Sequence, residues 1–215
     1  MKERNKLNKI EKLSRYTKLA WDRGLTESTG GNTSIRIDDK IYITPTFFIK
    51  HFITKGDFVE LNLNREKIKG DLEPSSEYKM HLKIYNERKD INCIFHAHPK
   101  WSTIYSVTSK KIPIRILPES IVLLGKIVYL PYKMPGTDEF ADVFTEGLRN
   151  GSNVFVLANH GVTVCAKTIE GAYARLETLE TCSYISAMAG MFSGKEPIQI
   201  TKNEANIFLR KLHMK

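Results

Sequence analysis

Three histidines in this sequence have the spacing of metal ligands. The segment from Cys93 to His98 has the composition of a β-strand, and alternation along a strand places His96 and His98 on the same face. A third histidine, His160, follows the apolar run Val154–Leu157 and stands beside a glycine. Three imidazole nitrogens with an open fourth position are typical of a catalytic metal centre. The alternative is a pair of ordinary strand histidines, one of them solvated.

A carboxylate and two serines lie upstream of the histidines, in the run Glu73-Pro74-Ser75-Ser76-Glu77. This run is expected to open a helix with Ser75 as its N-cap. Serine hydroxyls and free backbone N–H groups at a helix N-terminus bind anions such as phosphate. Glu77 has two interpretations that the sequence leaves open: an acid that complements the helix dipole, or a catalytic group.

A turn rich in glycine and serine precedes the first expected strand. Gly30 and Gly31 allow backbone N–H groups to approach a ligand closely, and Asn32 adds a side-chain donor. An ordinary turn before the hairpin is the alternative. The hairpin strands are expected over 34–37 and 40–43, and Pro45 should stop the second of them.

Glu119 is a further carboxylate with apolar neighbours in the sequence. Burial among such neighbours would raise its pKa. It is therefore either a solvated turn residue or a second proton carrier.

The whole chain has the composition of one soluble domain. A length of 215 residues with 41% hydrophobic content supports a single core, so one domain over 1–215 is expected. The apolar runs are too short to cross a membrane, and the N-terminus lacks the apolar region of a signal peptide. Three cysteines without a Cys-x-x-Cys pair favour a reducing compartment, which predicts a cytoplasmic protein with no membrane partner.

The net charge of +9 raises the question of nucleic-acid binding. Much of this charge lies in the first expected helix, Glu3–Asp22, on the face opposite its apolar residues. No nucleic-acid motif or aromatic interleaving accompanies the lysines. We therefore expect no nucleic-acid partner and an anionic small substrate, which a positive field would attract.

Strands and helices alternate through the middle of the chain, while the early hairpins argue against a purely parallel sheet. A mixed or antiparallel sheet with helices on both faces is expected. Beyond the first helix and hairpin, strands are predicted over 59–63, 67–69, 93–98, 112–117, 127–130, 153–159 and 162–166. Further helices are predicted from Ser75 and over 101–107, 138–149, 169–191 and 203–211.

Five motifs in order resemble those of the class II aldolase/adducin family. They are Gly31-Asn32-Thr33-Ser34-Ile35-Arg36, Ile43-Thr44-Pro45-Thr46, Pro74-Ser75-Ser76-Glu77, His96-Ala97-His98 and Asn159-His160-Gly161, and the likeness covers roughly residues 7 to 190. The resemblance implies a three-layer α/β/α fold with a largely antiparallel central sheet. It also implies one Zn²⁺ per subunit and a homotetramer with active sites near subunit interfaces.

The resemblance also assigns roles to individual residues. It implies that His96, His98 and His160 ligate zinc, and that Glu77 is the acid/base, which can also touch the metal. The implied phosphate contacts are Gly31, Asn32, Thr46, Phe47, Ser75 and Ser76, those at positions 31 and 47 through the backbone. Phe47 departs from the family pattern, which usually has glycine there. No tyrosine stands near Glu119, where fuculose aldolases have a catalytic one, and Glu119 could supply the missing proton transfer.

The activity implied is that of a lyase that cleaves a short sugar phosphate of the L-fuculose 1-phosphate type to dihydroxyacetone phosphate and an aldehyde. Within the family the alternatives are an L-ribulose-5-phosphate 4-epimerase or a methylthioribulose-1-phosphate dehydratase. A non-catalytic adducin-like module is the alternative from another class. Retention of all three histidines and Glu77 favours an enzyme.

Overall fold

The computed structural model describes residues 2–213, and its elements follow the expected alternation of strands and helices. The strands are β1 Asn32–Ile37, β2 Lys40–Ile43, β3 Val59–Asn62, β4 Lys67–Lys69, β5 Cys93–Ala97, β6 Ile127–Leu130, β7 Val154–Leu157 and β8 Gly161–Ala166. The α-helices are α1 Lys2–Asp22, α2 Tyr78–Glu87, α3 Lys100–Ser106, α4 Pro118–Leu124, α5 Asp138–Asp142, α6 Thr145–Arg149, α7 Ile169–Ser193 and α8 Lys202–His213. Two 3-10 turns, η1 Lys50–Phe52 and η2 Ile114–Ile116, complete the described elements.

The strands form one eight-stranded sheet in the order β4-β3-β2-β1-β5-β8-β7-β6. Every neighbouring pair is antiparallel except β6 and β7, which run parallel. The largely antiparallel sheet predicted from the sequence is therefore confirmed. At its centre β5 pairs with β1 on one side and β8 on the other, which brings residues from distant parts of the chain onto adjacent strands.

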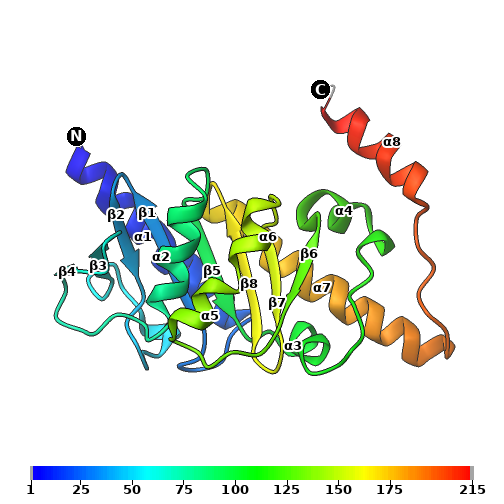
Figure 1. The fold of residues 1–215 in the computed structure, drawn as a ribbon, viewed down its shortest axis with the longest axis horizontal. Coiled ribbons are helices and arrows are strands. Elements are labelled where there is room, and N and C mark those ends of the chain that lie inside the picture. The colour runs from blue at the N-terminus through cyan, green and yellow to red at the C-terminus, as the bar shows by residue number, and fades with distance from the viewer. Residues whose placement is uncertain (1, 214–215) are drawn as a thin grey trace.

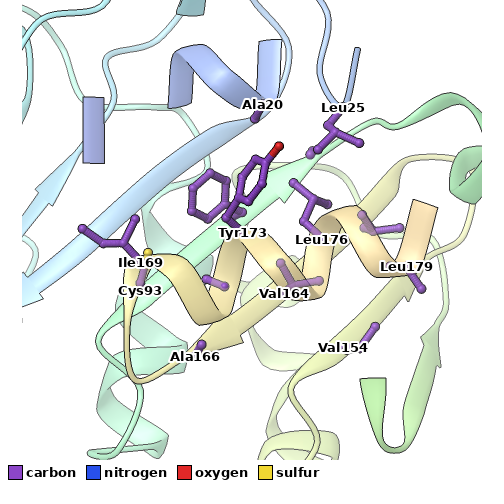
Figure 2. Packing of buried hydrophobic residues seen from close by; sticks show 14 of the residues in the cluster. Ala20, Leu25, Cys93, Val154, Val164, Ala166, Ile169, Tyr173, Leu176 and Leu179 are labelled. Atoms are coloured by element: carbon purple, nitrogen blue, oxygen red, sulfur yellow. The ribbon is translucent and has the colours of Figure 1, made fainter. Parts of the chain in front are cut away.

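Helices cover both faces of this sheet, which gives the three layers α/β/α (Figure 1). One buried cluster lies between the sheet and α1, α3, α4 and α7, and the other lies between the sheet and α2, α5 and α6. The buried residues Ile169, Tyr173, Leu176 and Leu179 lie on one face of α7. Figure 2 shows α7 laid across the first face of the sheet, with Ile169 next to Cys93 of β5 and Tyr173 directed toward Ala20 of α1. The helical spacing of these residues in the sequence explains why this one face of α7 is buried.

Three sequence predictions of secondary structure are wrong. The segment 112–117, expected to be a strand, contains the 3-10 turn η2 instead. The residues that follow it form helix α4, which begins with Pro118. Proline fits the first turn of a helix and disrupts a sheet ladder, which accounts for both differences. The single helix expected over 138–149 is divided into α5 and α6 at Val143 and Phe144. Helix α2 begins at Tyr78 with Glu77 as its N-cap, so Ser75 lies before the cap.

Two further features of the described residues concern the edge of the sheet and the composition of the helices. The edge strand β4 is exposed along its length and carries lysines at both ends. Charged side chains on an edge strand oppose pairing with the edge of another sheet. Across residues 2–213, no helix combines the length and apolarity needed to span a bilayer.

Candidate active site

Strand register brings the three histidines together. His96 lies in β5, directly opposite Thr163 of β8, and His98 follows the end of β5. His160 occupies the short turn between β7 and β8. A side chain at Gly161 would place its Cβ 2.5 Å from the Ala97 carbonyl oxygen and 2.5 Å from the His98 ring. The absence of a side chain at Gly161 therefore allows this turn to lie against the end of β5.

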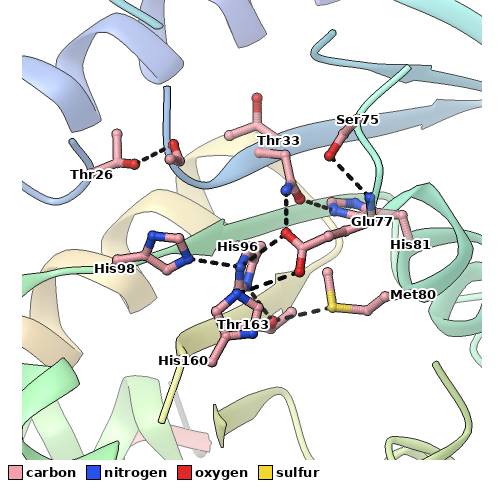
Figure 3. A network of polar contacts seen from close by, with 12 residues as sticks. Thr26, Thr33, Ser75, Glu77, Met80, His81, His96, His98, His160 and Thr163 are labelled. Carbon is pink, nitrogen blue, oxygen red and sulfur yellow. Dashed lines mark hydrogen bonds and ion pairs between the residues drawn. The ribbon is translucent and has the colours of Figure 1, made fainter. Parts of the chain in front are cut away.

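The imidazoles converge as the sequence predicted (Figure 3). One ring nitrogen from each of His96, His98 and His160 lies within 4.8 Å of the others, and the Nε2 atoms of His96 and His98 are 3.1 Å apart. Burial and the neighbouring histidines hold the pKa of His96 well below its usual value, and burial lowers that of His160 to about 4. Both rings are therefore neutral at pH 7 and have a lone pair to offer a metal ion.

Hydrogen bonds on the outer side of two rings fix which nitrogen faces the cluster. His96 Nδ1 lies 3.1 Å from the Thr163 hydroxyl, which donates to the sulfur of Met80, so the ring nitrogen donates to Thr163. His98 Nδ1 donates to Glu27 Oε1 at 2.7 Å. Both Nε2 atoms are left as acceptors, which is the arrangement in which a carboxylate or hydroxyl behind a histidine orients it for a metal.

Glu77 completes the cluster from the side of α2. Its side chain is buried, and its two carboxylate oxygens lie 3.2 Å from His96 Nε2 and 3.5 Å from His160 Nε2. Glu77 Oε2 accepts a hydrogen bond from Asn32 Nδ2 at 2.7 Å, whereas Oε1 has no hydrogen-bond partner among the described residues. Burial raises the pKa of Glu77, and the Asn32 bond opposes that shift.

The donor set fits a divalent cation. Neutral imidazole nitrogens and carboxylate oxygens close to one another repel through their lone pairs unless a cation or proton lies between them. Three nitrogens and an adjacent carboxylate oxygen are the ligand types that Zn²⁺ binds in catalytic sites. Buried Glu77, with each carboxylate oxygen close to one of the histidines, can also accept or return a proton at this position.

The segments predicted to hold phosphate lie side by side next to Glu77. The Thr33 N–H donates to the side-chain hydroxyl of Thr44, and the Thr44 N–H donates to the Thr33 carbonyl oxygen. These two hydrogen bonds join the start of β1 to the end of β2. Ser75 N donates to Thr44 O, and Thr46 N donates to Glu73 O, each at 3.0 Å. The structure thus brings Gly31, Asn32, Thr46, Phe47, Ser75 and Ser76 onto three adjacent segments. Ser75 is buried and Ser76 is exposed.

Two backbone conformations in these segments are those that glycine favours. Gly31 has φ of 66°, and a Cβ there would lie 2.6 Å from the His96 carbonyl oxygen. Phe47 has φ of 51°, and 84% of its surface is exposed. The backbone at this position is therefore left-handed, a conformation that glycine adopts without strain, and the phenylalanine ring projects outward from it.

Lys50 lies behind these segments and was not identified from the sequence. Only 2% of its surface is exposed, and its Nζ donates to Thr29 O at 3.0 Å and to Phe48 O at 2.8 Å. Lys50 thus ties the glycine turn to the segment that contains Phe47. Burial lowers the pKa of this ammonium group to about 8, and the negative charge of Glu27 opposes the shift.

The structure does not bring Glu119 to the cluster within one chain. Glu119 is exposed, which corresponds to the solvated residue among the two alternatives that the sequence left open. It lies in α4, which leads into the start of β6, whereas His160 follows the far end of the parallel strand β7. The two residues are therefore at opposite ends of the sheet.

Sequence reasoning missed four residues around the site: Glu27, His81, Thr163 and Lys50. Glu27 belongs to an irregular segment and Lys50 begins the three-residue turn η1, and both segments are too short or irregular for a period to indicate which side chains point inward. Thr163 could be found only through the register of β5 and β8. His81 had a signal, because a residue four positions after Glu77 lies on the same helical face.

Comparison with known proteins places the chain among sugar-phosphate aldolases by sequence similarity. Residues 11–187 match the family described as Class II Aldolase and Adducin N-terminal domain. An L-fuculose phosphate aldolase of Methanocaldococcus jannaschii is 39% identical over 160 residues, which are 74% of this chain and 85% of the relative. A 5-deoxy-D-ribulose 1-phosphate aldolase of Bacillus thuringiensis serovar kurstaki is 36% identical over 179 residues, 81% of this chain and 82% of that protein.

The fold has counterparts among solved structures. An L-fuculose 1-phosphate aldolase structure superposes with a TM-score of 0.87 at 29% identity and covers 96% of both chains. The structure of YgbL from Escherichia coli, described as a putative aldolase/epimerase/decarboxylase, gives a TM-score of 0.85 at 24% identity. It covers 94% of this chain and 98% of the other, and this likeness concerns the fold alone.

Proposed function

This chain belongs to the class II aldolase and adducin family, and from that membership we propose a zinc-dependent lyase acting on a short sugar phosphate. The reaction proposed is cleavage of a substrate of the L-fuculose 1-phosphate type to dihydroxyacetone phosphate and an aldehyde. The observation that carries this proposal is the contact of buried Glu77 with the three-histidine cluster. An adducin-like scaffold would have no physical need for this arrangement.

In the proposed site His96, His98 and His160 hold the metal, with Glu77 as a further ligand when no substrate is bound. Nitrogen-rich ligand sets suit Zn²⁺, whereas all-oxygen sets suit Mg²⁺ and Ca²⁺. When bound, such an ion supplies a Lewis acid that stabilises negative charge on a substrate oxygen. The hydrogen bonds from His98 to Glu27 and from His96 to Thr163 keep both rings in the orientation that this requires.

Glu77 is proposed to carry the proton of the reaction. Cleavage of a carbon–carbon bond next to a carbonyl leaves a carbanion equivalent that must be protonated, and synthesis requires the reverse transfer. A carboxyl group whose pKa is raised by burial can hold that proton closer to neutral pH. The free Oε1 of Glu77, which faces His160, is the proposed proton-carrying atom.

The phosphate is proposed to lie against Gly31, Asn32, Thr46, Phe47, Ser75 and Ser76. Backbone N–H groups and hydroxyls from three adjacent segments can converge on its oxygens. The ammonium group of Lys50 lies behind two of these segments and adds positive charge without contact with solvent. Binding of the phosphate fixes the reacting carbons relative to Glu77 and lowers the entropic cost of reaching the reactive geometry.

A homotetramer with sites near subunit interfaces also belongs to the proposal. Because Glu119 lies away from the cluster of its own chain, a role as second proton carrier would require it to act in the site of a neighbouring chain. Unchanged turnover and an unchanged pH profile in Glu119→Gln would remove Glu119 from the site.

The relative from Bacillus thuringiensis supplies a second candidate substrate, 5-deoxy-D-ribulose 1-phosphate. This sugar carries the same phosphate and keto group, so the choice between the two substrates concerns only the aldehyde released.

A coupled assay for dihydroxyacetone phosphate tests the proposal with both sugar phosphates. The zinc-loaded protein should release the product, and the chelated protein and the Glu77→Gln variant should not. The exposed Glu139 provides a matched control, because Glu139→Gln removes the same charge away from the buried cluster. A zinc-loaded protein that cleaves neither sugar would reject this assignment, and epimerase and dehydratase substrates would be tried next.

A further inference from the structure

A buried chain of polar side chains runs from Glu77 into the interior of the protein. Asn32 Oδ1 lies 2.5 Å from His81 Nε2, and His81 Nδ1 lies 2.7 Å from the Ser34 hydroxyl. The Ser34 hydroxyl in turn lies 2.8 Å from that of Tyr85. The side chains of His81, Ser34 and Tyr85 are fully buried. This series of hydrogen-bonded side chains links Glu77, the N-cap of α2, to strand β1 at the centre of the sheet.

The direction of each hydrogen bond follows from the chemistry of the groups. Asn32 directs its N–H to the Glu77 carboxylate, so its Oδ1 accepts from His81 and the proton of His81 lies on Nε2. Burial lowers the pKa of His81 to about 3, so the ring is neutral and its Nδ1 can only accept. Ser34 therefore donates to His81.

The Tyr85 hydroxyl must then donate to Ser34, because the only proton of Ser34 is already used. The alternative acceptor for Tyr85, the Asn92 carbonyl oxygen, is farther away at 3.5 Å. Every proton in the chain thus points toward Glu77. The opposite direction would place Asn32 Oδ1 against Glu77 Oε2 at 2.7 Å, where two acceptors repel.

We propose that His81 is a positioning residue for Glu77: it holds the Asn32 amide in the one orientation that donates to the carboxylate, as the middle of a one-directional chain from Tyr85. Hydrogen bonds in such a chain polarise one another, and burial strengthens each of them. The second N–H of the Asn32 amide stays available to a ligand, so the same amide can hold the carboxylate and touch a substrate oxygen.

This inference rests on the proposed function for its kinetic consequence, but the hydrogen-bond pattern can be tested without activity. Nitrogen-15 NMR of the zinc-loaded protein labelled at histidine reports which ring nitrogen carries the proton. The His81 signal is identified by its loss in His81→Gln. We expect a neutral ring protonated at Nε2, and a ring protonated at Nδ1 would overturn the proposal.

Two substitutions at position 81 test the consequence for catalysis. His81→Phe keeps an aromatic ring but cannot donate to Asn32. Because the Asn32 amide is then no longer held in the orientation that donates to the Glu77 carboxylate, kcat should fall roughly tenfold to a hundredfold. KM should change less than about threefold, because no substrate contact is removed. His81→Gln offers an N–H at the same reach and should recover most of kcat. Tyr78→Phe, on the same helix and without a hydrogen bond described for its hydroxyl, is the control.

The outcomes separate the two proposals. A folded, zinc-loaded His81→Phe with the kcat of the unsubstituted protein would reject the positioning role. Failure of the unsubstituted protein to cleave either sugar phosphate would reject the proposed function, while protonation of His81 at Nε2 would still support the hydrogen-bond chain. If His81→Phe does not fold, the NMR measurement on the unsubstituted protein decides.

Discussion

Lys50 offers a quantitative test of how the site is built. Its ammonium group is buried and bonded only to the carbonyl oxygens of Thr29 and Phe48 among the described residues. Replacing it by methionine removes the charge and keeps a flexible side chain of similar length. We expect Lys50→Met to change how the free energy of unfolding depends on pH.

The sign and size of the change follow from the lowered pKa. The pKa is about 8 in the folded protein and 10.5 in the unfolded chain, so the unfolded chain binds more protons between these values. The free energy of unfolding therefore rises with pH over this window. At about 1.36 kcal/mol per pH unit, the Lys50 contribution to the free energy of unfolding rises by roughly 2 to 3 kcal/mol between about pH 7 and about pH 10.

Urea denaturation of both proteins at a series of pH values gives this contribution as a difference, in which the titration of all other groups cancels. Protein concentration must be held fixed, because assembly shifts apparent stability. Exposed Lys133 is the control, and Lys133→Met should track the unsubstituted protein at every pH. A difference between Lys50→Met and the unsubstituted protein that stays constant with pH would refute the desolvation of this ammonium group.

Three further predictions concern the metal and the loops. Chelation should lower the melting temperature, by the equivalent of about 2.7 kcal/mol if zinc was present at about 100 times its Kd, and added zinc should restore it. Gly30→Ala places a Cβ 2.1 Å from Glu27 Oε1, which displaces the carboxylate from His98 and should weaken zinc binding roughly 10- to 100-fold in competition with a chromophoric chelator. Phe47→Gly should raise the free energy of unfolding by about 0.5 kcal/mol in urea, whereas Phe52→Gly, in a 3-10 turn, should lower it.

The sequence was most informative where local periodicity decides structure. Alternation in a strand predicted that His96 and His98 share a face, and the hairpin at 34–43 is present as β1 and β2. The type of element next to a proline was harder to predict, as helix α4 shows, whose first residue is Pro118. An apolar run after a proline is equally compatible with a strand and a short helix, because only the surrounding packing decides between them.

The histidines, Glu77 and the serines of the site could be predicted because the residue type alone indicates what chemistry each can do. The residues that orient them could not be predicted in this way. Glu27 and Thr163 act through contacts with His98 and His96, and these contacts depend on loop path and strand register. The sequence left open whether Glu119 is solvated or buried for the same reason, since apolar neighbours in sequence need not be neighbours in space.

The central pairing of β1, β5 and β8 has a consequence for the order of folding. The contact between His96 and Thr163 joins residues 67 positions apart, and that between Asn32 and Glu77 joins residues 45 apart. Contacts so distant in sequence form slowly, because long loops must close first. The ligand cluster therefore assembles only when most of the chain is already folded. Zinc should bind a finished scaffold and leave a chelated protein folded, unlike small zinc modules whose metal-free chains are unfolded.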